Sequence, residues 1–246
     1  MGMDKKIASI LILILLFCCV SVYAKNESRT FRDVKKQAKI IWQDHRVSFY
    51  CSCPYDTQLR VDHSACGYKP QDMKRANRIE WEHLVPVSWF SQQRPCWKQT
   101  MCKTQKGKAY SGRNCCEKVD AEFRLMYTDL HNLVPAVGEV NKARQYFRFV
   151  ASTDDAVVRN YNGCNIQINE LQKKVVPADS VKGMIARAHL YMQKTYDFKL
   201  SRQQNKLFLY WHKQYPPTEW ERIWNQRVMA IQGTDNSYIS QYDFSH

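Results

Sequence analysis

The sequence lacks a hydrophobic run long enough to cross a bilayer. Its longest, from Ile7 to Val20, has 14 residues, whereas a spanning helix needs about 20. Two lysines precede this run and the small residue Ala24 follows it, which is the pattern of a secretory signal peptide. We therefore predict a signal peptide at residues 1–24 and a periplasmic or secreted chain with no membrane anchor. An uncleaved anchor, or a lipid anchor at Cys18, is the alternative.

Internal repeats and low-complexity linkers are also absent, which disfavours a repeat protein or a chain of two domains. Without the signal peptide, residues 25–246 remain, a length that suits one well-packed domain. Helical spacing dominates its last third, and strand-like segments are few. We predict a single α+β domain that is mostly helical.

Cysteine is missing from the last 80 residues, yet eight cysteines precede them: Cys51, Cys53, Cys66, Cys96, Cys102, Cys115, Cys116 and Cys164. An even number in an exported chain indicates up to four disulfides. Eight cysteines allow 105 pairings, so the connectivity stays open. A zinc site is the alternative, but the spacing of Cys51 and Cys53 and the adjacent pair Cys115 and Cys116 fit the usual zinc motifs poorly.

Acidic residues are scarce relative to basic ones. The chain has 37 Lys and Arg against 23 Asp and Glu, a net charge of +14, of which the signal peptide accounts for +1. Such a charge attracts polyanions, and binding to phosphates releases condensed counterions. A basic protein that is merely kept soluble by its charge, or drawn to anionic lipid, remains the alternative.

The coarse pattern along the chain predicts the main elements. A helix is expected over residues 28–42, where apolar residues recur every three or four positions. Strands are expected over residues 46–56 and 121–135, with a disulfide-stapled loop over residues 91–117 between them. Further helices are expected from residue 136, around residues 181–191, and after the capping-box patterns SRQQ (201–204) and TEWE (218–221), the last helix ending at Gly233.

The segment RIEWEHLVPVSWF, residues 78–90, places Glu82 and His83 in an aromatic, apolar run. In a strand, Ile79, Trp81 and His83 would share one face, and Glu80 and Glu82 the other. A second strand through residues 127–132 and a helix carrying Asn141 would complete a ββα unit. A backbone carbonyl of that second strand could then fix the tautomer of His83. A buried structural histidine is the alternative.

Four ordered motifs, RIEWEHLVPVSWF, GRNCC, DLHNLVPAVGEVN and LSRQQNKLF, together resemble bacterial periplasmic endonuclease I, a family of non-specific nucleases with a ββα-metal finger. The resemblance implies that His83 is the general base and that Glu82 and Asn141 are metal ligands. It also implies that Arg113 binds the cleaved phosphate. The expected cofactor is Mg²⁺, with Ca²⁺ or Mn²⁺ as alternatives. The expected activity is hydrolysis of DNA and RNA by a monomer, leaving 5′-phosphate ends.

Other basic residues are candidates for contacts with nucleic acid. Lys142, Arg144 and Arg148 follow Asn141 on its helix, while Lys103, Lys106 and Lys108 lie in the enlarged loop near Arg113. A Cys102–Cys115 bridge is expected within that loop. The alternative for both groups is that these side chains contact only solvent. A non-catalytic basic protein on a nuclease scaffold and a phosphodiesterase for smaller substrates are the competing functions.

Overall fold

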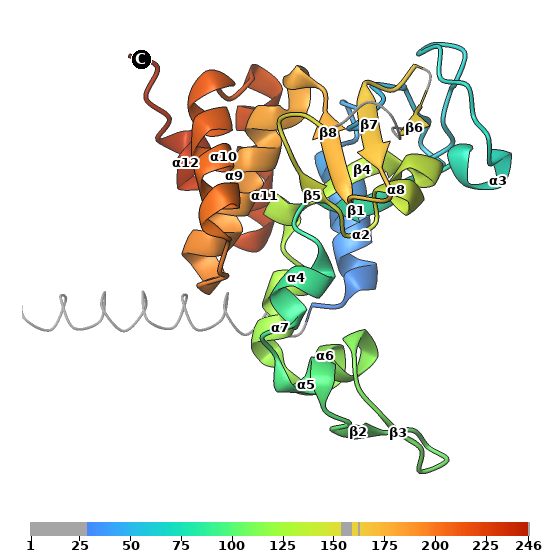
Figure 1. The fold of residues 1–246 in the computed structure, drawn as a ribbon, viewed down its shortest axis with the longest axis vertical. Helices are drawn as coiled ribbons and strands as arrows, with labels where there is room; N and C mark the ends of the chain where they lie inside the picture. Colours follow the sequence, from blue (N-terminus) through green and yellow to red (C-terminus); the bar gives the residue numbers. More distant parts are fainter. Residues whose placement is uncertain (1–28, 154–158, 162, 246) are drawn as a thin grey trace, which may run out of the picture.

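The computed structural model describes residues 29–153, 159–161 and 163–245, so the predicted signal peptide lies outside them. A main body carries two small sheets and the C-terminal helices, and a narrower part made of α4 to α7, β2 and β3 projects from it (Figure 1). The mixed, mostly helical composition confirms the predicted α+β class. Within the described residues, no helix is long and apolar enough to span a membrane.

The ββα unit lies at the centre of the main body. Strand β1 (Ile79–His83) pairs antiparallel with β4 (Leu133–Val137), with His83 opposite Leu133. Helix α8 (Gly138–Arg144) follows β4 directly. A Cβ atom at Gly138 would lie 2.6 Å from the backbone oxygen of Arg75 and 2.9 Å from Glu80 Oε1. Glycine therefore allows the start of α8 to approach β1 closely.

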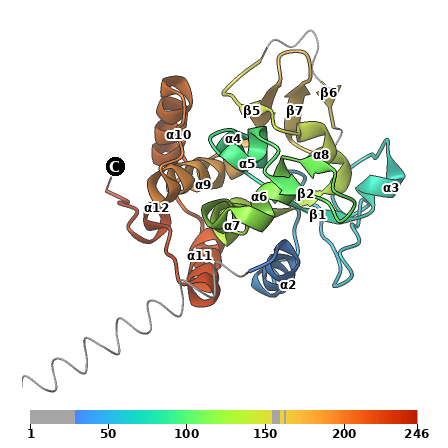
Figure 2. The same cartoon turned by 90° about the horizontal axis from the view of Figure 1, so that it is seen from below.

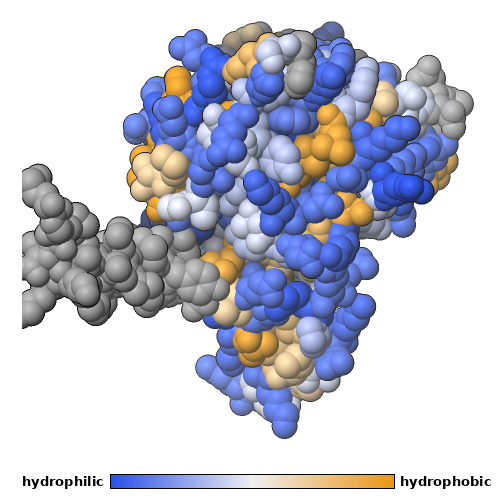
Figure 3. All heavy atoms as spheres, turned by 90° about the vertical axis from the view of Figure 1, so that its left-hand side faces the viewer, coloured by the Kyte–Doolittle hydropathy of each residue, from blue (hydrophilic) through white to orange (hydrophobic). Residues whose placement is uncertain are grey.

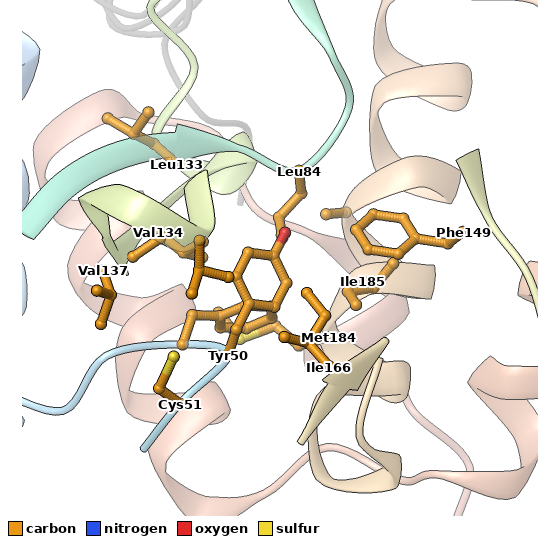
Figure 4. Close-up of a cluster of buried hydrophobic side chains, with 14 of the residues drawn as sticks. Tyr50, Cys51, Leu84, Leu133, Val134, Val137, Phe149, Ile166, Met184 and Ile185 are labelled. Carbon is orange, nitrogen blue, oxygen red and sulfur yellow. The ribbon is translucent and has the colours of Figure 1, made fainter. Parts of the chain in front are cut away.

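A second sheet and the N-terminal helix enclose the same core. The sheet has the order β5 (Arg148–Phe149), β8 (Lys174–Pro177), β7 (Ile166–Asn169) and β6 (Arg159–Asn160). Helix α2 (Phe31–Ile41) lies within its predicted range, residues 28–42, and begins at a capping box formed by Thr30 and Asp33. Figure 4 shows Leu84, Phe149, Ile166 and Ile185 in one buried cluster that β5 and β7 of this sheet help to form.

Four helices complete the main body: α9 (Asp179–Tyr196), α10 (Arg202–Gln214), α11 (Glu219–Gln232) and α12 (Ser237–Ser240). Figure 2 shows these helices grouped along one side of the molecule, with α9 and α10 next to β5. Ser201 and Thr218 cap α10 and α11 as predicted. However, Gln204 binds the Phe149 carbonyl and Glu221 pairs with Arg187, so their side chains serve packing between elements.

The projecting part has its own apolar cluster. It contains α4 (Val87–Ser91), α5 (Pro95–Lys98), the β2 (Cys102–Lys103) and β3 (Ala109–Tyr110) hairpin, α6 (Arg113–Val119) and α7 (Ala121–Tyr127). Phe90, Phe123 and four cysteines are buried in this cluster. Figure 3 shows that this part is narrower than the main body and that hydrophilic residues reach towards its tip. Residues 91–117 are therefore a folded unit, where the sequence predicted only a stapled loop.

All eight cysteines of residues 25–246 form disulfides, which excludes them as zinc ligands. Cys51–Cys164 and Cys53–Cys66 hold the main body, and Cys96–Cys116 and Cys102–Cys115 hold the projecting part. The predicted Cys102–Cys115 bridge is confirmed. Because both bridges of the projecting part end on α6, they fix the hairpin and α5 to the helix that begins at Arg113.

One predicted strand is wrong, and the other begins later than predicted. Residues 46–56 form turns with an isolated bridge between Val47 and Pro54, since two disulfides and a positive φ of 53° at Ser52 bend the chain there. Residues 121–127 form α7, which Asp120 caps through the backbone N–H of Phe123. A 3-10 turn, Leu130–Asn132, then leads into β4. A small helix, α3 (Met73–Ala76), precedes β1.

Candidate active site

His83 ends strand β1 at the junction between the main body and the projecting part. Its Nε2 lies 2.9 Å from the backbone oxygen of Tyr127. Because a carbonyl can only accept a hydrogen bond, Nε2 must carry the proton, and Nδ1 of the neutral ring is left as the basic nitrogen. The sequence predicted such a carbonyl on the second strand, but it comes from the last residue of α7.

The surroundings of His83 keep its imidazole uncharged. Burial lowers the pKa of His83 to about 4, and the positive charges of Arg113 and Arg144 act in the same direction. The hydrogen bond to Tyr127 opposes this shift without cancelling it. At neutral pH the ring is therefore free to accept a proton.

Two aromatic rings hold the imidazole plane. The ring of Phe31, at the start of α2, stacks on His83 with a centroid distance of 5.3 Å, and Tyr127 stacks on it at the same distance. Phe31 and Tyr127 also stack on each other at 4.7 Å. The sequence alone does not reveal this role of Phe31, because helical periodicity indicates only that the residue lies on the apolar face of α2 and gives no tertiary partner.

Arg113 lies beside this aromatic group at the first residue of α6. Its guanidinium is 5.6 Å from the centre of the Tyr127 ring and is exposed to solvent. Gly112, with a φ of 87°, turns the chain into the helix just before it. Tyr127 thus contacts His83 through its carbonyl and Arg113 through its ring, so the structure brings these two predicted catalytic residues together.

Glu82 points to the opposite face of β1 from His83 and is buried. Its Oε1 lies 2.8 Å from Nη1 of Arg144, which also donates to the backbone oxygen of His83 at 2.9 Å. Burial raises the pKa of the Glu82 carboxyl to about 7, while the charge of Arg144 and its hydrogen bond favour the ionised form. The pair ties α8 to the end of β1.

Asn141 projects from α8 towards the same face of β1. Its Nδ2 donates to Oε2 of Glu80 at 3.1 Å; Arg75 donates to the same oxygen, and Arg78 donates to Oε1. The alternation of the strand already places Glu80 beside Glu82 on this face. Asn141 and Glu82, the predicted pair of metal ligands, therefore lie on the same face of β1 as Glu80, whose carboxylate is paired with two arginines.

The donor atoms on this face suit a hard divalent cation. Carboxylate and amide oxygens are the ligands that Mg²⁺ prefers, and Mg²⁺ usually keeps several water molecules or substrate oxygens as well. Glu82 and Asn141 could supply two such oxygens, held by the packing of α8 against β1. In the described part of the chain, no group of three or more His, Cys, Asp or Glu side chains is placed to bind a metal ion.

The basic residues expected to contact nucleic acid are divided by their burial. Lys142 and Arg148 are exposed, but Arg148 lies on β5 and not on the helix of Asn141 as expected. Nζ of Lys142 lies 3.9 Å from Oδ2 of Asp72. Arg144 is 1% exposed, and its guanidinium packs 4.6 Å from the centre of the Phe149 ring. The expectation that Arg144 contacts nucleic acid is therefore wrong, because this side chain is used entirely inside the fold.

Comparison with known proteins identifies relatives of this chain. The sequence profile described as Endonuclease I matches residues 19–242. An extracellular deoxyribonuclease of Aeromonas hydrophila is 41% identical over 87% of this chain and 90% of its own length. A periplasmic deoxyribonuclease of the same organism is 39% identical over 88% of this chain and 87% of its own length. Endonuclease-1 of Buchnera aphidicola (strain Bp) is 36% identical over 88% and 84%, respectively.

The profile covers more than nine tenths of the chain, and the match includes the ββα unit, both parts of the fold and all eight disulfide-bonded cysteines. The arrangement of His83, Arg113 and the oxygen donors on β1 and α8 lies within the same range. The chain belongs to the endonuclease I family.

Proposed function

We propose that this protein is an exported, metal-dependent endonuclease that hydrolyses DNA and RNA without sequence preference and leaves 5′-phosphate ends. The observation that carries the proposal is the hydrogen bond from His83 Nε2–H to the Tyr127 carbonyl. This bond leaves Nδ1 of an uncharged imidazole as a base on the side of the molecule where Arg113 is exposed. The names of the relatives, extracellular and periplasmic deoxyribonuclease, support both the activity and the export.

Each residue has a separate task in the reaction. His83 Nδ1 removes a proton from the attacking water. Arg113 donates two hydrogen bonds in fixed geometry to phosphate oxygens, which a lysine could not do in the same way. Glu82 and Asn141 would hold the cation, which when bound would act as a Lewis acid and stabilise negative charge on the phosphate and the leaving 3′ oxygen. Phosphate contacts carry no base information, which accounts for the absence of sequence preference.

The test is cleavage of supercoiled plasmid and of RNA by the purified protein, with Mg²⁺, with Ca²⁺ or Mn²⁺, and with a chelator. We expect cleavage only with a divalent cation, and product ends that ligate without prior phosphorylation. His83→Ala should lower the rate by about 10²–10⁴-fold with an unchanged melting temperature. His63→Ala, which changes a histidine bonded to Asn77, serves as the matched control.

The competing function is a basic protein that binds nucleic acid without cutting it. This alternative predicts binding of DNA but no metal-dependent cleavage by the wild-type protein. Near-normal cleavage by His83→Ala would show that the protein is a nuclease but that another residue is the general base.

A further inference from the structure

The β2–β3 hairpin carries a positive charge that the fold does not neutralise. Lys103, Lys106 and Lys108 are all exposed, and residues 91–116 contain no Asp or Glu. Arg94, at the base of this part, forms ion pairs with Asp120 and Glu122. Within the described residues, none of the three lysines forms such a pair. The hairpin therefore presents three cations to a partner outside the chain.

The hairpin is held in a fixed shape. Cys102 pairs with Tyr110 across the two strands and is bonded to Cys115 of α6. At the tip, the backbone N–H groups of Thr104 and Gly107 bond to the oxygens of Lys108 and Thr104, each at 2.9 Å, and Gly107 has a φ of 79°. Little backbone conformational entropy is therefore lost when the hairpin binds a ligand.

The base of the hairpin opens towards the candidate active site. A hollow between the hairpin and α6 is lined by Lys103, Tyr110, Arg113 and Lys118, among others. Arg113 is also the residue whose guanidinium lies against Tyr127 beside His83. The hollow therefore joins Arg113 to Lys103 at the base of the hairpin, and Lys106 and Lys108 follow towards the exposed tip. Figure 1 shows the hairpin extending away from the main body below α6.

We propose that this hairpin is a second binding element for duplex DNA, in which Lys103, Lys106 and Lys108 contact backbone phosphates next to the one that is cut. The inference rests on the proposed nuclease function. A two-stranded ribbon fits the major groove, which is about 12 Å wide, and lysines on its rims reach phosphates on both sides. An anionic membrane is disfavoured, because the tip residues Thr104, Gln105 and Gly107 offer no apolar side chain to insert.

The test compares Lys103→Gln/Lys106→Gln/Lys108→Gln with a control of equal charge, Arg202→Gln/Lys206→Gln/Lys213→Gln, whose residues are exposed on α10. The dissociation constant for a 40-base-pair duplex is measured by fluorescence anisotropy in chelator between about 50 and 200 mM salt. Three lost phosphate contacts should reduce the salt slope by about 2.7, so this rise in salt should weaken wild-type binding about 40-fold more than binding by the hairpin variant.

Several outcomes would overturn the inference. These are a slope unchanged from the wild type, a slope that falls equally in the control variant, or lost binding to phosphatidylserine vesicles with DNA binding intact. Equal melting temperatures of the three proteins establish that the hairpin variant is folded. Binding is measured without cleavage, so the two proposals can fail separately. The hairpin proposal fails if the salt slope of the hairpin variant is unchanged. The proposed function fails if the wild type binds DNA but does not cut it.

Discussion

Arg144 and Glu82 form a buried ion pair, with Nη1 and Oε1 2.8 Å apart and side chains 1% and 8% exposed. The same guanidinium donates to the backbone oxygens of His83 and Leu84. One side chain of α8 thus fixes both a candidate metal ligand and the backbone of the candidate base. This relationship makes Arg144 a positioning residue, and the first prediction concerns its removal.

Arg144→Met should destabilise the protein strongly, because it leaves the Glu82 carboxylate buried without its partner. Breaking one side of a buried pair typically costs about 3–5 kcal/mol. Urea unfolding monitored by tryptophan fluorescence measures the loss. Arg148→Met, on an exposed arginine four residues later, should change the free energy of unfolding by less than about 0.5 kcal/mol. Equal effects of the two substitutions would contradict the assigned role.

The second prediction concerns the geometry of phosphate binding. Arg113→Lys keeps the charge but loses the paired N–H donors, so kcat on plasmid DNA should fall by about 10²-fold while KM changes little. Lys206→Arg, on the exposed side of α10, is the control and should leave kcat unchanged. A kcat for Arg113→Lys within a factor of two of the wild type would show that a point charge is sufficient there.

The sequence predicted the parts of the site that lie on one regular element. The alternation along residues 79–83 identified the face of Glu82 and the end position of His83, and the placement of Asn141 one turn into a helix is confirmed. The second strand was misplaced because the buried residues Phe123, Met126 and Tyr127 have helical spacing, which a short segment does not distinguish reliably from a strand.

The partners of the site residues could not be predicted, since they depend on tertiary packing. Arg144 follows Asn141 by three residues and has the same sequence character as Lys142, yet it is buried against Phe149 and Glu82. Nothing in the charge pattern of α8 separates the two. Likewise, the stacking of Phe31 on His83 joins residues 52 positions apart, which only the docking of α2 against the projecting part determines.

The third prediction compares two disulfides of the main body. Cys51–Cys164 closes a separation of 113 residues and Cys53–Cys66 one of 13. In the chain-entropy account, a longer closed loop restricts the unfolded state more. Cys51→Ala/Cys164→Ala should therefore cost about 4–5 kcal/mol and Cys53→Ala/Cys66→Ala about 3 kcal/mol. Urea unfolding under non-reducing conditions measures both, and the reverse order would contradict the entropic explanation.

The fourth prediction concerns acid stability and His189. This side chain is buried in α9, with Nδ1 2.8 Å from the Ile185 backbone oxygen and its ring 4.1 Å from that of Phe208. Burial lowers the pKa of His189 to about 3, against an ordinary value near 6.5 in the unfolded chain. The unfolded state therefore binds a proton that the folded state does not, and stability is lost as the pH falls below about 6.5.

Between about pH 6 and pH 4, this single group should reduce the free energy of unfolding by about 1.4 kcal/mol per pH unit. His189→Leu replaces the titrating group with an apolar side chain of similar size. The slope of the free energy of unfolding against pH should therefore become smaller by that amount in this range. Above pH 7, His189 is uncharged in both the folded and the unfolded wild-type protein. The free energies of unfolding of the wild type and the variant should therefore change in parallel with pH there. Urea unfolding at half-unit intervals of pH measures both slopes, and an unchanged slope in the variant would show that His189 does not limit acid stability.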